Sequence, residues 1–260
     1  MCAIVLVAGC GGGNDKCDPV AQSGCDHGQV CEQIASSGTP ACFAPVELRG
    51  RVLDLATSTG VAGARVVAVD VNGAAVSGVA ISGADGSYAL QVPAQRGADG
   101  TPGAFPVTLR ADAAGYQSFP GTIRQPLPVD VATAVAMNGT YVVKSTLTDI
   151  GLFARTGAGK GAIHGHVAIA DDHAGVLVVA ELAGKGAAVI AARDGDYAIY
   201  NLDAGHYTVT AYARGHVYPP GEVDVAGDVK LDLALGKDLP GSLSGQVSIV
   251  DASGGAATSV

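Results

Sequence analysis

Three histidines are the side chains whose types and spacing most favour metal chemistry. His164 and His166 alternate along one segment, and His173 follows directly after two aspartates. Imidazole and carboxylate groups together are ligands for zinc or copper. On a strand, however, His164 and His166 would point to one face, opposite the apolar positions, and that face would meet solvent. We therefore favour surface histidines and expect neither a metal nor another cofactor.

Signatures of catalysis are missing from the sequence. No serine has glycine two positions before and after it, as a nucleophile elbow requires, and there is no His-Glu-x-x-His. The segment 157–161 (Gly-Ala-Gly-Lys-Gly) has some glycines of a phosphate-binding loop. That motif requires Gly where Ala154 stands and Ser or Thr where Gly161 stands. We interpret the segment as a linker and expect the chain not to be an enzyme.

Four cysteines cluster in a short N-terminal stretch and favour disulfide chemistry. The intervals between them are seven, five and ten residues, and no Cys-x-x-Cys pair of a structural zinc site is present. In an exported segment such a cluster predicts two disulfides, with three connectivities open. The stretch is too short for its own core, so these bridges should stabilise it. The candidates are Cys17, Cys25, Cys31 and Cys42.

The first residues indicate export. The apolar run at 3–7 is too short to span a bilayer and ends in small residues, as a signal peptide does. The stretch Leu6–Cys10 (Leu-Val-Ala-Gly-Cys) closely resembles a bacterial lipobox. The resemblance implies cleavage after a signal peptide at 1–9 and lipidation of Cys10, which anchors the chain in the cell envelope, at the outer membrane. No Lys or Arg precedes the run, which leaves open whether the true start lies upstream of Met1.

Composition and charge point to short strands and argue against nucleic acid. The formal net charge is −9, whereas phosphate binding requires clustered Lys and Arg. The chain contains 38 Gly and 12 Pro but no Trp, and Ala and Val supply most of its apolar residues. Val-rich runs between Gly, Asp and Pro clusters are typical of strands and tight turns, and no window has a sustained helical period.

The body of the chain repeats the same order of short segments. The first copy runs from Leu48–Val52 through an Asp-Gly-Ser-Tyr segment at 85–88 to Gly115-Tyr116. The second runs from Ile163–Val167 through Asp-Gly-Asp-Tyr at 194–197 to Gly215-His216. Asp-Gly before an alternating strand predicts a tight turn. Residues at period two face one side of a sheet; these are Tyr197, Ile199, Tyr207, Val209 and Ala211. A third copy opens at Leu243–Val247.

A further hairpin is predicted inside the first copy. Asn138-Gly139 separates the apolar stretches Val129–Met137 and Tyr141–Leu147, and Asn-Gly is a strong signal for a two-residue turn. The stretch from Gln95 to Ala104 has no counterpart in the second copy, and we interpret it as a long Gly-rich loop. Short strands at regular spacing indicate a sandwich or barrel.

These segments resemble the carboxypeptidase regulatory-like domain. The shared pattern is Gly-x-Val, Gly-Ala-x-Val, Asp-Gly-x-Tyr, Leu-x-Ala-Gly-x-Tyr and then Gly-Tyr or Gly-His. The resemblance implies tandem antiparallel Greek-key β-sandwiches of the transthyretin (prealbumin) type, without the zinc peptidase activity of the neighbouring catalytic domain. The expected units are a tether and Cys-rich segment at 10–45, a sandwich at 46–155, a linker at 156–162, a second sandwich at 163–236 and a truncated third at 237–260.

The sequence therefore favours a non-catalytic, lipid-anchored envelope protein with structural, adhesive or spacer modules. Two alternatives stay open. One is a carbohydrate-binding module, with Tyr200 and Tyr212 as sugar-contacting rings because both alternate with core positions. The other is an accessory region of an enzyme whose catalytic domain follows Val260. The expected partners are the membrane, through the lipid, and glycans or envelope proteins, but not nucleic acid.

Overall fold

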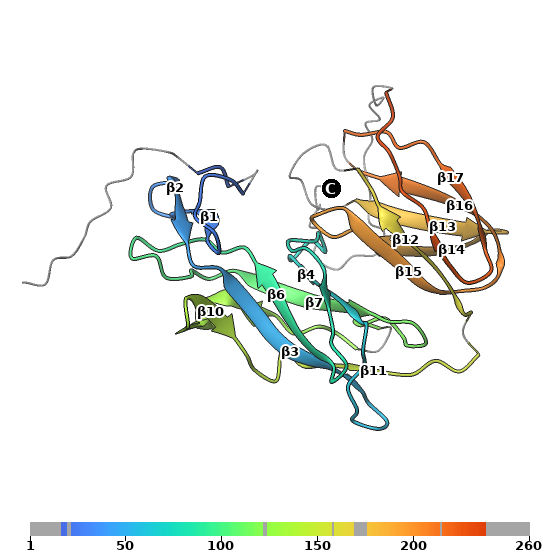
Figure 1. The fold of residues 1–260 in the computed structure, drawn as a ribbon, viewed down its shortest axis with the longest axis horizontal. Coiled ribbons are helices and arrows are strands. Elements are labelled where there is room, and N and C mark those ends of the chain that lie inside the picture. The colour runs from blue at the N-terminus through green and yellow to red at the C-terminus, as the bar shows by residue number, and fades with distance from the viewer. Residues whose placement is uncertain are drawn as a thin grey trace, which may run out of the picture.

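The computed structural model describes residues 17–19, 22–121, 124–157, 159–168, 176–213 and 215–237 as an all-β chain (Figure 1). The predicted fold class is confirmed: within these ranges the one helical element is a 3-10 turn, Val131–Thr133. No helix in this part of the chain is long and apolar enough to cross a membrane. Four predictions fall outside the described residues, namely the signal peptide, Cys10, His173 and the third copy from 238 onward.

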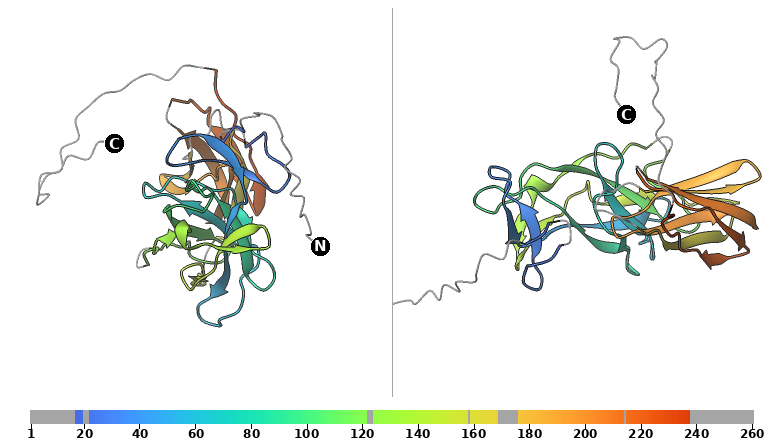
Figure 2. Two further views of the ribbon diagram at one scale, coloured as in Figure 1. Left: turned by 90° about the vertical axis from the view of Figure 1, so that its left-hand side faces the viewer. Right: turned by 90° about the horizontal axis from the view of Figure 1, so that it is seen from above.

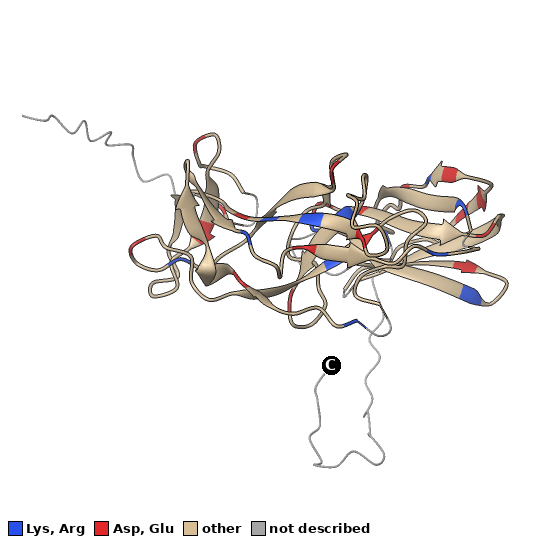
Figure 3. Ribbon diagram, turned by 90° about the horizontal axis from the view of Figure 1, so that it is seen from below, with Lys and Arg blue, Asp and Glu red and all other residues tan. Residues whose placement is uncertain are grey.

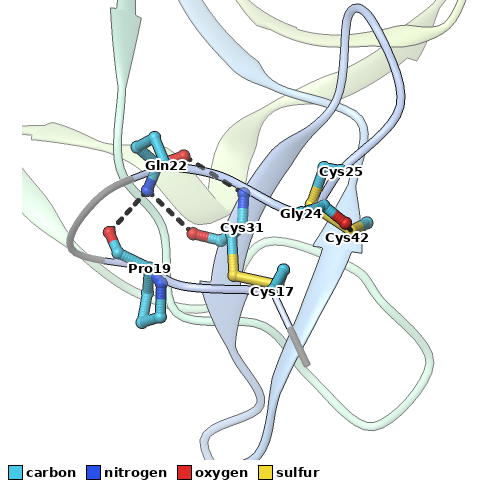
Figure 4. The surroundings of a disulfide bond; sticks show 7 residues. All are labelled: Cys17, Pro19, Gln22, Gly24, Cys25, Cys31 and Cys42. Atoms are coloured by element: carbon cyan, nitrogen blue, oxygen red, sulfur yellow. Dashed lines mark hydrogen bonds between the residues drawn. A yellow bond between two sulfur atoms is a disulfide. The ribbon is translucent and has the colours of Figure 1, made fainter. Parts of the chain in front are cut away.

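The N-terminal cysteines form two disulfides around a short antiparallel hairpin. Cys31 on its first strand bonds to Cys17, and Cys42 on its second strand bonds to Cys25 (Figure 4). Both strands are thus tied to the loop that precedes the hairpin. The predicted pair of disulfides is confirmed, with one of the three open connectivities realised. The hairpin consists of β1 (Val30–Gln33) and β2 (Pro40–Phe43).

One side-chain amide holds the loop before the hairpin. Gln22 Nε2 donates to the carbonyls of Pro19 at 2.7 Å and Cys31 at 2.9 Å, while its Oε1 accepts from the Cys31 amide at 3.1 Å (Figure 4). The amide side chain therefore completes the backbone pairing of β1 where no second strand does so.

The first sandwich has two facing sheets around one core. In the first sheet, β3 lies centrally, with β6 on one edge and β10 and β11 on the other, and β9 pairs with β10. Its strands are β3 (Val46–Asp54), β6 (Ser87–Val92), β9 (Val135–Met137), β10 (Thr140–Val143) and β11 (Ile150–Leu152). The second sheet has the order β5-β4-β7-β8 and consists of β4 (Arg65–Val69), β5 (Ala80–Ile81), β7 (Pro106–Asp112) and β8 (Val129–Asp130).

The sequence predicts antiparallel sandwiches, but two pairings in the first sandwich are parallel. Both β10 and β11 run parallel to β3, following one another along the same edge. The chain crosses from the facing sheet to β9 and turns through a hairpin into β10, so β10 is not joined to β3 by a hairpin of its own. Alternate residues of β3 are buried, and Val46, Leu48 and Val52 are all fully enclosed in the core.

The second sandwich repeats this arrangement around its own core. One sheet has the order β15-β12-β18, again with a parallel last strand, and the other has the order β14-β13-β16-β17. The predicted period-two set Tyr197, Ile199, Tyr207, Val209 and Ala211 is buried in this core, which confirms the alternation. The strands are β12 (Gly161–His166), β13 (Leu177–Leu182), β14 (Lys185–Ile190), β15 (Asp196–Leu202), β16 (Gly205–Tyr212), β17 (Gly221–Val225) and β18 (Asp228–Lys230).

A close backbone approach explains the repeated Gly-x-Val and Asp-Gly-x-Tyr segments. In the first sandwich the carbonyl of Thr148 packs against Gly50, where a Cβ would overlap it, and the buried Tyr88 hydroxyl donates to that carbonyl at 2.6 Å. In the second sandwich Leu231 takes the place of Thr148: it lies against Gly165 and accepts from Tyr197 at 2.6 Å. The glycine makes room for the last segment, and the tyrosine holds it.

The residue after each of these glycines completes the contact. The backbone amide of Arg51 donates to the Asp149 carboxylate, and that of His166 donates to Asp232, both at 2.9 Å. The Arg51 side chain then reaches the carbonyl of Asp85, just as His166 Nε2 lies 2.8 Å from the carbonyl of Asp194. His166 therefore occupies the structural position of Arg51.

The predicted turns are confirmed, but one predicted strand is wrong. Gly86 and Gly195 have φ of 81° and 88°, and Asn138-Gly139 turns between β9 and β10 with φ of 50° and 80°. The stretch Val129–Met137, however, is divided between the two sheets. The Asp130 carboxylate accepts from the amide of Ala132 and caps the 3-10 turn, which redirects the chain from β8 to β9.

The three units lie in sequence order along the molecule. Seen from above, the disulfide hairpin is at one end, the first sandwich is in the middle and most of the second sandwich is at the other end (Figure 2). Acidic and basic positions are mixed along this body, and neither sign gathers into one continuous face in the view of Figure 3.

Replacement of Gly50 or Gly165 by alanine tests the close approach. Each added Cβ would overlap a backbone carbonyl, so we expect a loss of roughly 2–4 kcal/mol in the free energy of unfolding, measured by urea denaturation. Gly227→Ala is the matched control, because no atom lies within 4 Å of its Cβ position. Equal stability of all three variants would contradict the assigned contact.

Candidate functional site

The Gly-rich loop predicted from Gln95 to Ala104 carries a fully buried arginine. Arg96 is 0% exposed, and its Nε donates to Oε2 of Glu32 on β1 at 2.5 Å. A second guanidinium nitrogen donates to the carbonyl of Ala44 at 2.7 Å. The other Glu32 oxygen accepts from the amide of Ala94 at 2.7 Å. A buried charge pair thus fastens the disulfide hairpin to the first sandwich.

Both the backbone and the side chain of Arg96 take part in this docking. Its amide donates to the carbonyl of Gln33 at 3.0 Å, and its carbonyl accepts from the amide of Ala35 at 2.8 Å. The guanidinium lies 5.0 Å from the ring centre of Phe43 and 5.4 Å from that of Tyr141. These aromatic faces add cation–π attraction to the docking contact.

Burial and pairing act in opposite directions on Glu32. Removal of water raises the pKa of its carboxyl group above the usual value, while the Arg96 guanidinium and the Ala94 amide draw the pKa back down. The ion pair persists in the interior because hydrogen bonds satisfy both partners.

The two sandwiches are also joined by direct hydrogen bonds. Asn201, at the end of β15, has a φ of 64°; its Oδ1 accepts from the Gly115 amide at 2.7 Å and its Nδ2 donates to the Tyr116 carbonyl at 3.0 Å. At a second point, the amide of Arg193 donates to the carbonyl of Ser77 at 2.9 Å. The linker predicted at 156–162 is therefore not the sole connection between the sandwiches.

Tyr200 and Tyr212, the predicted sugar-contacting rings, do not form one platform. Tyr200 is on the outer face of the β15-β12-β18 sheet, whereas Tyr212 is on the outer face of the opposite sheet. Tyr212 is 55% exposed. Tyr200 shares a small cavity with Arg110 and Asp112 of the first sandwich, and burial raises the pKa of its hydroxyl. Strand alternation correctly predicts that both side chains point outward, but it does not predict which other segments cover them.

His164 and His166 do not form a metal site with other residues in the described part of the chain. His164 and His166 are both exposed on β12, as expected, but His166 is held against the Asp194 carbonyl. In the described part of the chain, one group of three metal-capable side chains is close enough to share an ion: Cys17, Cys25 and Cys42, whose sulfurs are all in disulfides.

Two adjoining hollows lie where the hairpin and both sandwiches meet. Their volumes are about 280 and 290 Å³, and both are lined by Gln22, Glu32, Pro93 and Arg193. Gln95 and Phe105 line the first hollow. Sequence reasoning did not identify this junction, because its walls come from segments that are far apart in the chain.

Comparison with known proteins does not assign a family. No protein-family model matches the sequence, and no curated protein matches it. Among solved structures, the Bacillus anthracis TIE protein is 14% identical with a TM-score of 0.28, covering 76% of this chain and 35% of its own. The chain thus spans about a third of the length of that protein.

Two further solved structures illustrate the same level of similarity. Shaft pilin SpaA from Lactobacillus rhamnosus GG is 12% identical with a TM-score of 0.27, covering 77% of this chain and 99% of its own. Chlorocatechol 1,2-dioxygenase from Pseudomonas putida is 14% identical with a TM-score of 0.27, covering 42% and 60%. Similarity at this level assigns no function.

Removal of the Arg96 charge should release the disulfide hairpin. In Arg96→Met the Glu32 carboxylate stays buried without its partner, so we expect a loss of about 3–5 kcal/mol and faster protease cleavage between the hairpin and β3. The double variant Glu32→Met/Arg96→Met should recover much of this stability. As a control, Arg49→Met removes a partly exposed pair with Glu47 and should change stability by about 1 kcal/mol or less. Wild-type resistance in Arg96→Met would refute the docking role.

Proposed function

We propose that the chain is a non-catalytic, lipid-anchored protein of the cell envelope whose sandwiches form a spacer that holds a structural or adhesive surface away from the membrane. The observation that carries the proposal is the fastening of three units into one body. The hairpin is joined through the buried Glu32–Arg96 pair, and the sandwiches are joined through Asn201. Unlike a chain of free domains, a body fastened in this way keeps the separation of its two ends.

The anchor would lie at the hairpin end of this body. Cys10 precedes Cys17 by a few residues, and Cys17 is bonded to β1. Most of the second sandwich lies at the far end of the molecule (Figure 2). Each buried methylene of an acyl chain contributes about 0.8 kcal/mol, so several chains would hold the protein stably at a bilayer.

The repeated sequence pattern supports the assignment of the sandwiches to the carboxypeptidase regulatory-like type. Its glycine and tyrosine positions hold backbone segments together, and Arg51 and His166 serve the same structural purpose in the two copies. The residues of the pattern are thus occupied in maintaining the fold, in keeping with modules that support other surfaces and carry no chemistry of their own.

Replacement of the proposed lipidation residue tests the anchor. Cys10→Ser should lose acyl labelling and move from the membrane fraction to the soluble fraction, because the thiol that accepts the lipid is gone. Labelling with a radioactive fatty acid and cell fractionation measure both effects. Cys2→Ser is the matched control and should remain labelled and membrane-bound. A Cys10→Ser protein that stays acylated would refute the proposed anchor.

A further inference from the structure

We propose that the junction between the hairpin and the two sandwiches binds a neutral saccharide unit. This inference goes beyond the spacer role and stands independently of the lipid anchor. It rests on the two adjoining hollows of about 280 and 290 Å³, which share four lining residues and are together called the cavity below. Junctions between domains are frequent places for ligand sites, because both walls can contribute polar groups.

A buried carboxylate supplies the hydrogen-bond acceptor of this cavity. Glu32 is 6% exposed and lines both hollows. Its two oxygens receive one hydrogen bond each, from Ala94 and Arg96. A carboxylate offers about four lone-pair sites, so Glu32 can accept further hydrogen bonds from ligand hydroxyl groups.

The other walls add donors and an apolar surface. Arg193 of the second sandwich lines both hollows close enough to Glu32 to lower its pKa, and a guanidinium carries five N–H donors. The carboxamides of Gln33 and Gln95 can both donate and accept. The ring of Phe105 and the ring of Pro93 offer apolar faces. A sugar ring, with hydroxyl groups at its edge and C–H groups on its faces, is complementary to this combination.

The charges around the cavity favour an uncharged ligand. Glu32 is paired with Arg96. Arg193 is followed directly by Asp194, whose carboxylate lies beside Gly78, a residue of the second hollow. With two positive and two negative groups, neither an anion nor a cation gains a net attraction on entering. We therefore assign the site to a neutral saccharide in preference to a charged metabolite or a charged peptide.

The test is a titration of the purified full chain with cellobiose, maltose, N,N′-diacetylchitobiose and a tetra-alanine peptide, followed by amide NMR. We expect one disaccharide to bind at up to millimolar concentration and to shift amides of residues 31–33, 94–96 and 193. Arg193→Ala and Gln95→Ala should each weaken its binding about tenfold, because each removes hydrogen bonds to the ligand. Unperturbed amide signals from the two cores will show that both variants remain folded.

Matched substitutions outside the cavity distinguish a specific site from a general effect. Arg49→Ala and Gln125→Ala remove the same side-chain types away from the cavity walls and should leave the affinity unchanged. The proposal is overturned if none of the disaccharides binds, if the tetra-alanine peptide alone binds, or if binding persists undiminished in both cavity variants. Because none of these outcomes depends on lipidation, failure here would leave the proposed anchor standing.

Discussion

The buried ion pair between Glu32 and Arg96 is the interaction on which the arrangement of the N-terminal half depends. The hairpin is too small to form a core, and its disulfides bind it only to itself. Its position on the first sandwich comes mainly from Arg96, whose guanidinium contacts a carboxylate, a backbone carbonyl and two aromatic rings. The backbone of Arg96 adds hydrogen bonds to Gln33 and Ala35. A buried pair of this kind contributes less to net stability than to placement, because desolvation offsets much of the attraction.

Each sandwich is likewise closed by a small set of contacts. In both, a glycine admits a carbonyl, a tyrosine hydroxyl binds it, and an aspartate accepts from the residue after the glycine. These contacts join the first strand to the last segment of each sandwich. They therefore connect the two parts of each sandwich that are farthest apart in sequence. Asn201 then adds the contact between the sandwiches, at a left-handed backbone position that asparagine tolerates better than most residues.

Much of the fold can be predicted from the sequence, because its signals are local. Gly86 and Gly195 supply the positive φ of the Asp-Gly turns, and strand alternation places Tyr197 and Ile199 inside. The division of Val129–Met137 between two sheets could not be predicted, because the stretch contains no Gly or Pro to mark a turn and the break depends on the cap made by Asp130.

The candidate site was beyond sequence reasoning for a different physical reason. Arg96 and Glu32 are separated by 64 residues, and each resembles an ordinary surface charge in its own segment. Their burial results from packing of the inserted loop against the hairpin. The outward position of Tyr200 can be predicted from strand alternation. Its covering by the first sandwich cannot, because the covering residues lie in a distant part of the sequence.

The contacts through Asn201 and Arg193 hold the two sandwiches as one body. Residual dipolar couplings of backbone amides at 46–152 and 163–233 test it most directly, because they report the orientation of each sandwich in a common frame. One alignment tensor that fits both sets, with the orientation shown in Figures 1 and 2, is the expected result. Two tensors of different magnitude would show that the sandwiches reorient independently about the linker and would contradict the account.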